Sequence, residues 1–163
     1  MARRARFLWL AEKACELTVS RIIPLETERQ RNVENRVRGA TLDKARRRAT
    51  EACKQCGNAW APVIDDVTPL EQIDRTTASV RWLLAAAEGK PVDDLDAGPV
   101  GWIVGPEGGL TPHEISYCRD ALHATPTWLA PTVLRFETAA IAAAAITLDR
   151  RRLASLAASR PRG

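Results

Sequence analysis

The sequence lacks an apolar run long enough to cross a membrane, because its most apolar stretch, residues 139–148, is short and is followed by arginines. The first ten residues contain arginines but no apolar segment of secretory length. The four cysteines in 163 residues do not make a disulfide framework. These absences favour one domain, typical in size for 163 residues, in a reducing cytoplasm.

The sequence also lacks a complete set of metal ligands. Cys53 and Cys56 form one CxxC pair, but neither a second pair nor paired histidines complete a zinc site. Both thiols continue a helical spacing of apolar residues, so we expect them in a helix core rather than on a metal. His113 and His123 are isolated, and we expect surface or capping roles for them. The sequence therefore predicts no metal site.

The most informative segment runs from the strand-like residues 100–104 through Gly105-Pro106-Glu107-Gly108-Gly109-Leu110. A helix is expected next, because Thr111 suits the N-cap, Pro112 the first helical position and Glu114 the capping box. A strand, a glycine loop and a helix N-terminus in this order point backbone amides at one small space. That arrangement suits the polar edge of a ligand, although a tight strand-to-helix turn explains the glycines equally well.

The usual phosphate motifs do not fit this loop. Its last glycine is followed by Leu110 and Thr111, not by Lys and Ser or Thr, and the dinucleotide fingerprint is absent. Glu107 adds a negative charge that would repel phosphate. A neutral or cationic ligand is therefore favoured.

A second segment follows a short apolar strand at residues 127–129 and leads into an alanine-rich helix at residues 139–148. This helix has a thin side-chain layer, so another element can pack very close to it. Its neighbour can be its own sheet, a knotted backbone or a second subunit, and these alternatives remain compatible with one another.

Two motifs together resemble a known family. Residues 105–110, with Val133-Leu134-Arg135 and Glu137-Thr138-Ala139, resemble the paired C-terminal motifs of the ribosomal small-subunit RNA methyltransferase E family, which belongs to the trefoil-knotted SPOUT methyltransferases. Residues 12–17, residues 22–25 with Glu28-Arg29, and residues 51–57 resemble earlier segments of that family. The resemblance spans roughly Leu8 to Leu148.

The resemblance implies a SPOUT fold with a C-terminal trefoil knot, and a homodimer that transfers methyl from S-adenosylmethionine to ring nitrogen 3 of a uridine in 16S ribosomal RNA. It assigns cofactor binding to Val104, Gly105, Pro106, Glu107, Gly108, Gly109, Leu110, Leu129, Ala130, Val133 and Leu134. Arg135 is the candidate catalytic residue, as a fixed positive group that stabilises the developing anion. An ion pair with Glu137 is its alternative role.

The chain departs from the family pattern at Ala130 and at Thr132, where a glycine and an arginine are common, and Ala130 can narrow the pocket. The resemblance also implies that the family's N-terminal PUA-like RNA-binding domain and its leading strand are absent. Two alternatives therefore remain, a related SPOUT enzyme acting on another RNA and a truncated, non-catalytic dimeric module that binds RNA or cofactor.

The net charge of +4 is mildly basic, and several arginines are clustered. The polar stretch 26–39 is the best candidate for RNA contact, through Arg29, Arg31, Arg36 and Arg38. Residues 150–163 form a basic tail. Hydrophobic periodicity predicts helices near 7–17, 40–56, after Thr68 and after Thr111, and strands near 22–25, 63–64, 79–84, 100–104 and 127–129, with an exposed loop at 88–99. The fold class is α/β, a mainly parallel sheet with helices on both faces.

Overall fold

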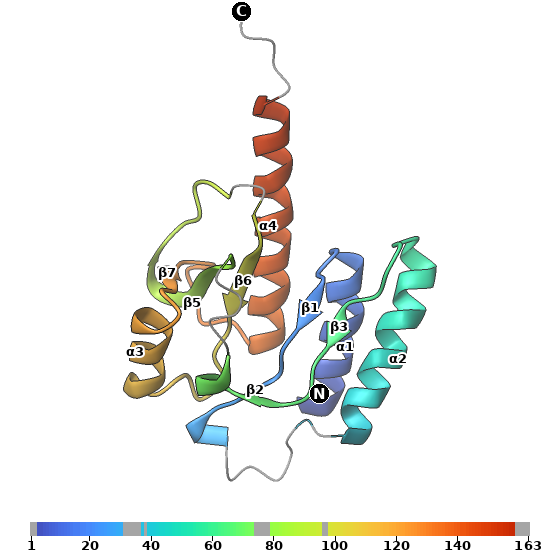
Figure 1. Cartoon of the computed structure of the whole chain (residues 1–163), viewed down its shortest axis with the longest axis horizontal. Helices are drawn as coiled ribbons and strands as arrows, with labels where there is room; N and C mark the ends of the chain where they lie inside the picture. The colour runs from blue at the N-terminus through green and yellow to red at the C-terminus, as the bar shows by residue number, and fades with distance from the viewer. Residues whose placement is uncertain (1–2, 31–36, 38, 74–78, 96–97, 159–163) are drawn as a thin grey trace, which may run out of the picture.

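The fold is seen in a computed structural model, which describes residues 3–30, 37, 39–73, 79–95 and 98–158. Four helices, α1 (Arg3–Glu16), α2 (Gly39–Cys56), α3 (Pro112–Asp120) and α4 (Phe136–Ala158), surround short strands (Figure 1). The strands are β1 (Arg21–Ile22), β2 (Leu25–Glu26), β3 (Val63–Ile64), β4 (Thr68–Pro69), β5 (Arg81–Lys90), β6 (Val100–Ile103) and β7 (Thr125–Thr127). Two 3-10 turns, η1 (Glu28–Gln30) and η2 (Leu70–Gln72), complete the set.

All described strand pairs are parallel, as the sequence predicted. They form three small sheets, with β1 beside β3, β2 beside β4, and the order β6-β5-β7 in the third. The predicted single sheet is therefore divided within the described residues. One division separates β1 and β3 from β2 and β4, and another lies between β1 and β6, where residues of both strands line a cavity.

Helices cover both faces of the third sheet. Leu84 and Ile103 pack with Cys118 and Leu122 of the α3 region, whereas the neighbouring residue Leu83 belongs to a cluster that includes Ile146 of α4. Successive strand residues point to opposite faces, so the two clusters lie on opposite sides of the sheet. The expected arrangement of helices on both faces is confirmed.

The N-terminal half forms a separate apolar cluster. Phe7, Leu10 and Ala11 of α1 pack on the small buried face of α2, which consists of Leu42, Ala45, Ala49 and Ala52. Small residues on α2 allow the two helices to approach closely. Cys53 is half-buried but Cys56 is exposed, so the expectation of two core thiols is wrong for Cys56, which lies in the last turn of α2, where the buried face has ended.

Three local expectations are also corrected. The predicted strand at 22–25 is divided into β1 and β2 around Ile23 and Pro24. Thr68 lies in β4 and donates its hydroxyl to the Asp66 carbonyl, so it does not cap a helix; the turn that follows is η2. The predicted loop at 88–99 begins only after β5 ends at Lys90, and its Val92 and Leu95 are buried.

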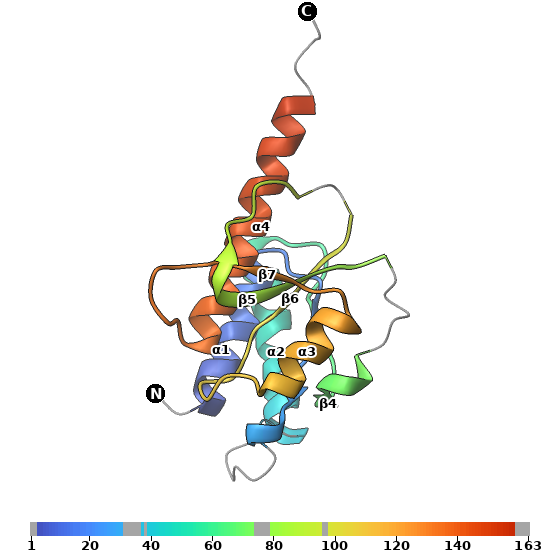
Figure 2. The ribbon, with the colours of Figure 1, turned by 90° about the vertical axis from the view of Figure 1, so that its left-hand side faces the viewer.

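Figure 2 shows α4 projecting beyond the body of the molecule. Its first half is packed, with Ala139 and Ala143 buried, whereas Leu153 near its C-terminal end is exposed. No helix among the described residues is long and apolar enough to cross a membrane.

Candidate functional site

The glycine loop connects β6 to α3 and contains a tight turn. Gly109 has a φ of +70°, a conformation that favours glycine, and its amide donates to the Pro106 carbonyl at 2.8 Å. Among the residues that the structure describes, a Cβ built on Gly108 or on Gly109 would meet only the Arg29 side chain within 4 Å. The loop backbone is therefore open to a ligand apart from one flexible side chain.

The predicted capping box at the start of α3 is confirmed. The Glu114 amide donates to the Thr111 hydroxyl at 3.2 Å, and the Thr111 amide donates to the Glu114 carboxylate at 2.7 Å. The second carboxylate oxygen of Glu114, a side chain that is almost fully buried, accepts from the Glu28 amide at 2.8 Å. These amides are used by the protein itself, so the ligand-facing donors have to come from the loop before Thr111.

Arg29 lies on the glycine loop. Its guanidinium donates to the Gly108 carbonyl, and the side chain is exposed. The residue expected to contact RNA is thus beside the segment expected to bind cofactor. Arg31, Arg36 and Arg38, the other expected RNA contacts, lie outside the described residues.

A cluster around Arg6 connects the glycine loop to the start of α4. The Arg6 guanidinium forms an ion pair with Glu107 of the loop, and its Nε lies 3.8 Å from Oε1 of Glu137. It also lies over the ring of Phe136, 5.6 Å from the centroid. The side chains of Arg6 and Glu137 are 12% and 9% exposed, so this pair is largely removed from water, whereas the Glu107 side chain is 37% exposed. Arg6 therefore offsets the charge of Glu107, which the sequence had suggested would face a cationic ligand.

The second predicted segment is the connection between β7 and α4. It begins where the Trp128 amide donates to the Lys90 carbonyl at 2.9 Å. Leu129, Ala130 and Leu134 are half-buried, whereas Val133 is 96% exposed and so presents its side chain to the outside.

Arg135 is exposed just before α4, and its carbonyl accepts the Ala139 amide at 2.8 Å. Glu137, the partner considered for Arg135, is instead beside Arg6. Within the described residues Arg135 has no ion-pair partner, which leaves its guanidinium available for another group.

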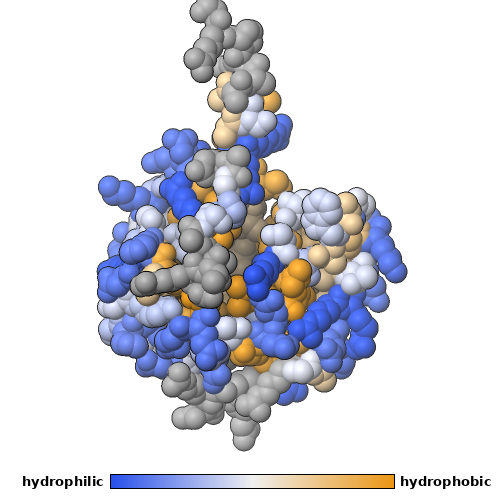
Figure 3. Space-filling model, viewed as in Figure 1, coloured by the Kyte–Doolittle hydropathy of each residue, from blue (hydrophilic) through white to orange (hydrophobic). Residues whose placement is uncertain are grey.

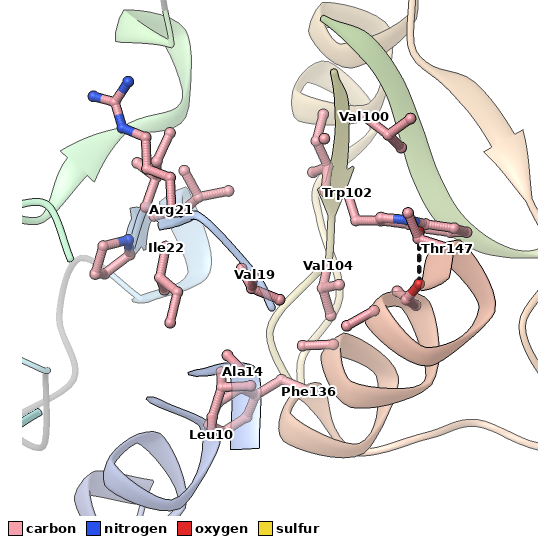
Figure 4. Close-up of a pocket in the computed structure, with 18 of the residues that line it drawn as sticks. Leu10, Ala14, Val19, Arg21, Ile22, Val100, Trp102, Val104, Phe136 and Thr147 are labelled. Carbon is pink, nitrogen blue, oxygen red and sulfur yellow. Dashed lines mark hydrogen bonds between the residues drawn. The ribbon is translucent and has the colours of Figure 1, made fainter. Parts of the chain in front are cut away.

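An apolar cavity of about 520 Å³ lies next to the loop, between α1, β1 and β2 on one side and β6 and α4 on the other (Figure 4). Four predicted cofactor residues, Val104, Gly105, Pro106 and Glu107, contribute to its lining. Gly108, Gly109, Leu110, Leu129, Ala130, Val133 and Leu134 do not. The predicted set is thus divided between the cavity mouth and the surface around the loop and the β7–α4 connection.

Titratable residues in and beside α3 are Cys118 and a group around His113. Burial raises the pKa of the Cys118 thiol to about 11, so this cysteine is a core residue rather than a nucleophile. His113 is exposed, as expected, with its Nδ1 3.4 Å from Glu28 Oε1. Glu28, Glu71 and His113 present ligand atoms within 4.8 Å of one another, a grouping that the sequence spacing did not reveal.

Sequence reasoning missed Arg6 as part of the site. It appeared only as one member of an arginine-rich start, and clusters of that kind are equally compatible with phosphate binding or a solvated helix face. Nothing in the local pattern distinguishes the arginine that turns inward.

Comparison with known proteins gives consistent results. The profile of the RNA methyltransferase domain family matches residues 1–148. Proteins named ribosomal RNA small subunit methyltransferase E from Mycobacterium bovis and Mycobacterium tuberculosis are each 35% identical over 118 residues, which is 64% of this chain and 45% of each relative. The chain therefore spans less than half the length of these curated relatives.

Solved structures show the same similarity. A methyltransferase from Legionella pneumophila in complex with S-adenosylmethionine is 29% identical, with a TM-score of 0.77, over 91% of this chain and 62% of the other. Ribosomal RNA small subunit methyltransferase E from Neisseria gonorrhoeae, bound to S-adenosyl methionine, is 26% identical with a TM-score of 0.77, over 93% of this chain and 62% of the other.

Proposed function

The chain belongs to the RNA methyltransferase domain family, and from this premise we propose that it transfers a methyl group from S-adenosylmethionine to ring nitrogen 3 of a uridine in 16S ribosomal RNA. The names of the curated relatives support ribosomal RNA as the substrate. Two similar structures contain S-adenosylmethionine, which supports the choice of cofactor. The proposal extends to a homodimer and to a C-terminal trefoil knot, which are features of the family that the sequence resembles.

The observation that carries the proposal is the open backbone of the glycine loop. Among the described residues, only Arg29 limits the space over Gly108 and Gly109, and Gly109 already has the conformation that bulkier residues resist. Residues 104–110 and the segment 129–134 would hold the cofactor. When bound, the cofactor supplies an electrophilic methyl group on a cationic sulfur.

The residues of this chain would supply orientation and charge. N3 of uridine becomes nucleophilic when it loses its proton, so a fixed positive group beside the base favours the reaction. The guanidinium of Arg135, which is exposed and has no ion-pair partner among the described residues, fits that role. Arg29, beside the loop, is placed to contact an RNA phosphate.

The cofactor site is tested by Gly109→Val. A β-branched residue is strained at a φ of +70° and would fill the open side of the loop, so S-adenosylmethionine binding should be lost in calorimetry while the fold is kept. Gly57→Val is the matched control, because Gly57 has a φ of +74° and lies in the turn after α2. If both variants bind cofactor like the parent, the loop is not part of the site.

The reaction is tested by transfer of a labelled methyl group to 16S ribosomal RNA and to assembled small subunits, followed by mapping of the modified nucleotide. The proposal requires a methylated uridine at N3. Methylation of a different RNA would favour a related enzyme, and cofactor binding without transfer to any RNA would favour a non-catalytic module.

A further inference from the structure

Three side chains of the types that bind metal ions come together beside α3, although they are far apart in the sequence. Glu28 lies in η1, Glu71 in η2 and His113 in the first turn of α3. Each offers one ligand atom, and the three atoms lie within 4.8 Å of one another. The proposed methyl transfer uses none of these residues, so the cluster requires a separate explanation.

The cluster concentrates negative charge. The carboxylates of Glu28 and Glu71 repel each other at this range. No lysine or arginine among the described residues forms an ion pair with either of them. The basic group beside them is the His113 imidazole, whose Nδ1 lies 3.4 Å from Oε1 of Glu28. A divalent cation between the three side chains would offset the charge of both carboxylates.

The spacing of the ligand atoms suits a small ion. A tetrahedral zinc ion with bonds of about 2.1 Å separates its ligand atoms by about 3.4 Å. The distance between His113 Nδ1 and Glu28 Oε1 already has this value, 3.4 Å. Glu28 and His113 are exposed and Glu71 is half-buried, so the side chains can adjust around an ion while one coordination position stays open to water.

The backbone that carries these ligands is held by α3. The Glu28 amide donates to the Glu114 carboxylate at 2.8 Å. The Glu71 carbonyl accepts from the Tyr117 hydroxyl at 2.9 Å. Glu114 and Tyr117 belong to the same helix as His113, so α3 sets the positions of all three ligands. This preorganisation lowers the entropic cost of binding an ion.

The surroundings and the donor set narrow the choice of ligand. In Figure 3, the surface at the lower left, where α3 lies in Figure 1, is mostly hydrophilic, whereas hydrophobic residues gather at the centre of this face. Mg²⁺ and Ca²⁺ prefer oxygen ligands alone. One imidazole nitrogen with two carboxylate oxygens is instead a set of donors that suits zinc.

We propose that Glu28, Glu71 and His113 bind one Zn²⁺ ion through two carboxylate oxygens and one imidazole nitrogen, with water in the fourth position. The ion joins η1, η2 and the start of α3, and so stabilises the fold at this edge of the molecule. Arg29 follows Glu28 and donates to the Gly108 carbonyl, so the ion also fixes the turn that places Arg29 beside the glycine loop.

The test adds zinc chloride to the whole chain in its reduced form at neutral pH. Calorimetry should show one ion bound per chain, and excess zinc should raise the temperature of unfolding by at least about 3 °C. Hydrogen exchange should slow at residues 28–30, 70–73 and 111–115. Magnesium chloride should produce none of these changes, because Mg²⁺ prefers oxygen ligands. Equal effects of the two ions would indicate an unspecific acidic patch and would overturn the proposal.

Matched variants locate the site. His113→Asn and Glu71→Gln should each weaken zinc binding at least about tenfold, because each removes one ligand. His123→Asn and Glu51→Gln are the controls, since both residues are exposed and neither belongs to the cluster. They should leave zinc binding unchanged. Parent-like binding by His113→Asn or by Glu71→Gln would overturn the proposal.

The thiols of Cys53 and Cys56 are the competing zinc ligands, and Co²⁺ as a substitute ion distinguishes the two sites on the parent protein. Co²⁺ bound through oxygen and nitrogen has only weak visible absorption, whereas thiolate ligands add an intense charge-transfer band in the near ultraviolet. The proposal requires the first spectrum, and the second would assign the metal to the cysteines and overturn it. S-adenosylmethionine binding is measured separately on the same samples, so failure of the zinc site and failure of the proposed function are distinguishable.

Discussion

Arg6 connects three parts of the chain that are distant in sequence. It belongs to α1, and its guanidinium contacts Glu107 in the glycine loop and Glu137 in the first turn of α4. Because the glycine loop is one predicted cofactor-binding segment and the start of α4 follows the other, Arg6 is in a position to fix their relative placement. The Glu137 side chain is largely buried, so without Arg6 its charge would have neither a cation nor water to stabilise it.

Arg6→Ala should therefore lower the free energy of unfolding by about 1–3 kcal/mol, measured by urea denaturation, because it leaves the largely buried Glu137 without a nearby cation. Cofactor affinity should fall as well. Arg48→Ala is the control, because its pair with Glu12 is exposed at 3.3 Å and should contribute less than about 1 kcal/mol. Equal losses in the two variants would show that the Arg6 cluster has no special role.

Arg135→Ala should reduce the rate of methyl transfer far more than cofactor affinity, if the guanidinium acts on the developing anion. Arg135→Lys should restore little of the rate, because the planar fork is lost. Unfolding monitored in parallel separates this from a structural role, since an exposed side chain should change stability by less than about 0.5 kcal/mol. A comparable loss of stability and rate would contradict the catalytic assignment.

For single residues, the sequence predicted best those contacts that join residues close together in the chain. The capping box at Thr111 and Glu114 was predictable because all its contacts lie within one helical turn. The second role of Glu114, as acceptor for the Glu28 amide, joins residues 86 positions apart and leaves no trace in the local pattern. The contacts of Arg6 and Arg29 escaped prediction for the same reason.

Among the elements, α3 is held to the rest of the fold through Glu114. Glu114→Gln keeps the shape of the side chain but replaces one accepting oxygen by an NH₂ group, which cannot accept the Glu28 or Thr111 amide. We expect a loss of about 1–3 kcal/mol in thermal or urea unfolding.

Glu16→Gln is the control for this change, because Glu16 is exposed and forms its hydrogen bond with Lys13 on the surface of α1. It should shift unfolding by less than about 0.5 kcal/mol. A Glu114 variant as stable as this control would show that the bond to Glu28 is dispensable.

The types of most elements were predictable, but their limits were not. The helix expected at 139–148 extends over Phe136–Ala158, because arginines that interrupt an apolar run do not interrupt a helix. β5 continues to Lys90 through an irregular register with β7, which brings Gly89 against the Thr127 backbone. Only a residue without a side chain fits there, and a single glycine in the sequence does not predict such a close backbone contact.

For the whole molecule, the projecting half of α4 is the surface best suited to the proposed homodimer. Leu153 of this half is exposed, and Figure 2 shows that the half extends past the body of the molecule. Light scattering should give about twice the chain mass of 17.9 kDa, and Leu153→Glu should weaken association.

Trp60→Ser is the matched control for the dimer, because Trp60 is a more exposed apolar residue in the α2–β3 connection and should not affect association. A monomer at micromolar concentration would contradict the dimer. A dimer that weakens only with Trp60→Ser would place the interface elsewhere.

The fold class followed from the alternation of helix-like and strand-like segments, and the parallel pairing confirms it. The separation into three sheets could not be predicted, because the sequence of a strand is equally apolar whether one or both of its edges are paired. Val100 and Ile22 are apolar in either case, and only the three-dimensional arrangement shows that they face an open cavity.

The parallel pairing also has a consequence for how the chain folds. Arg21 pairs with Val63, and Leu83 pairs with Thr125. Each of these strand pairs can form only after the long segment between its strands has closed into a loop. Contacts of this range cost loop-closure entropy before they contribute energy, which slows folding relative to a helical bundle of similar size. We therefore expect α1 and α2 to collapse early and the β6-β5-β7 ladder to assemble late, so the edge that borders the cavity stays open to other chains through most of the folding reaction.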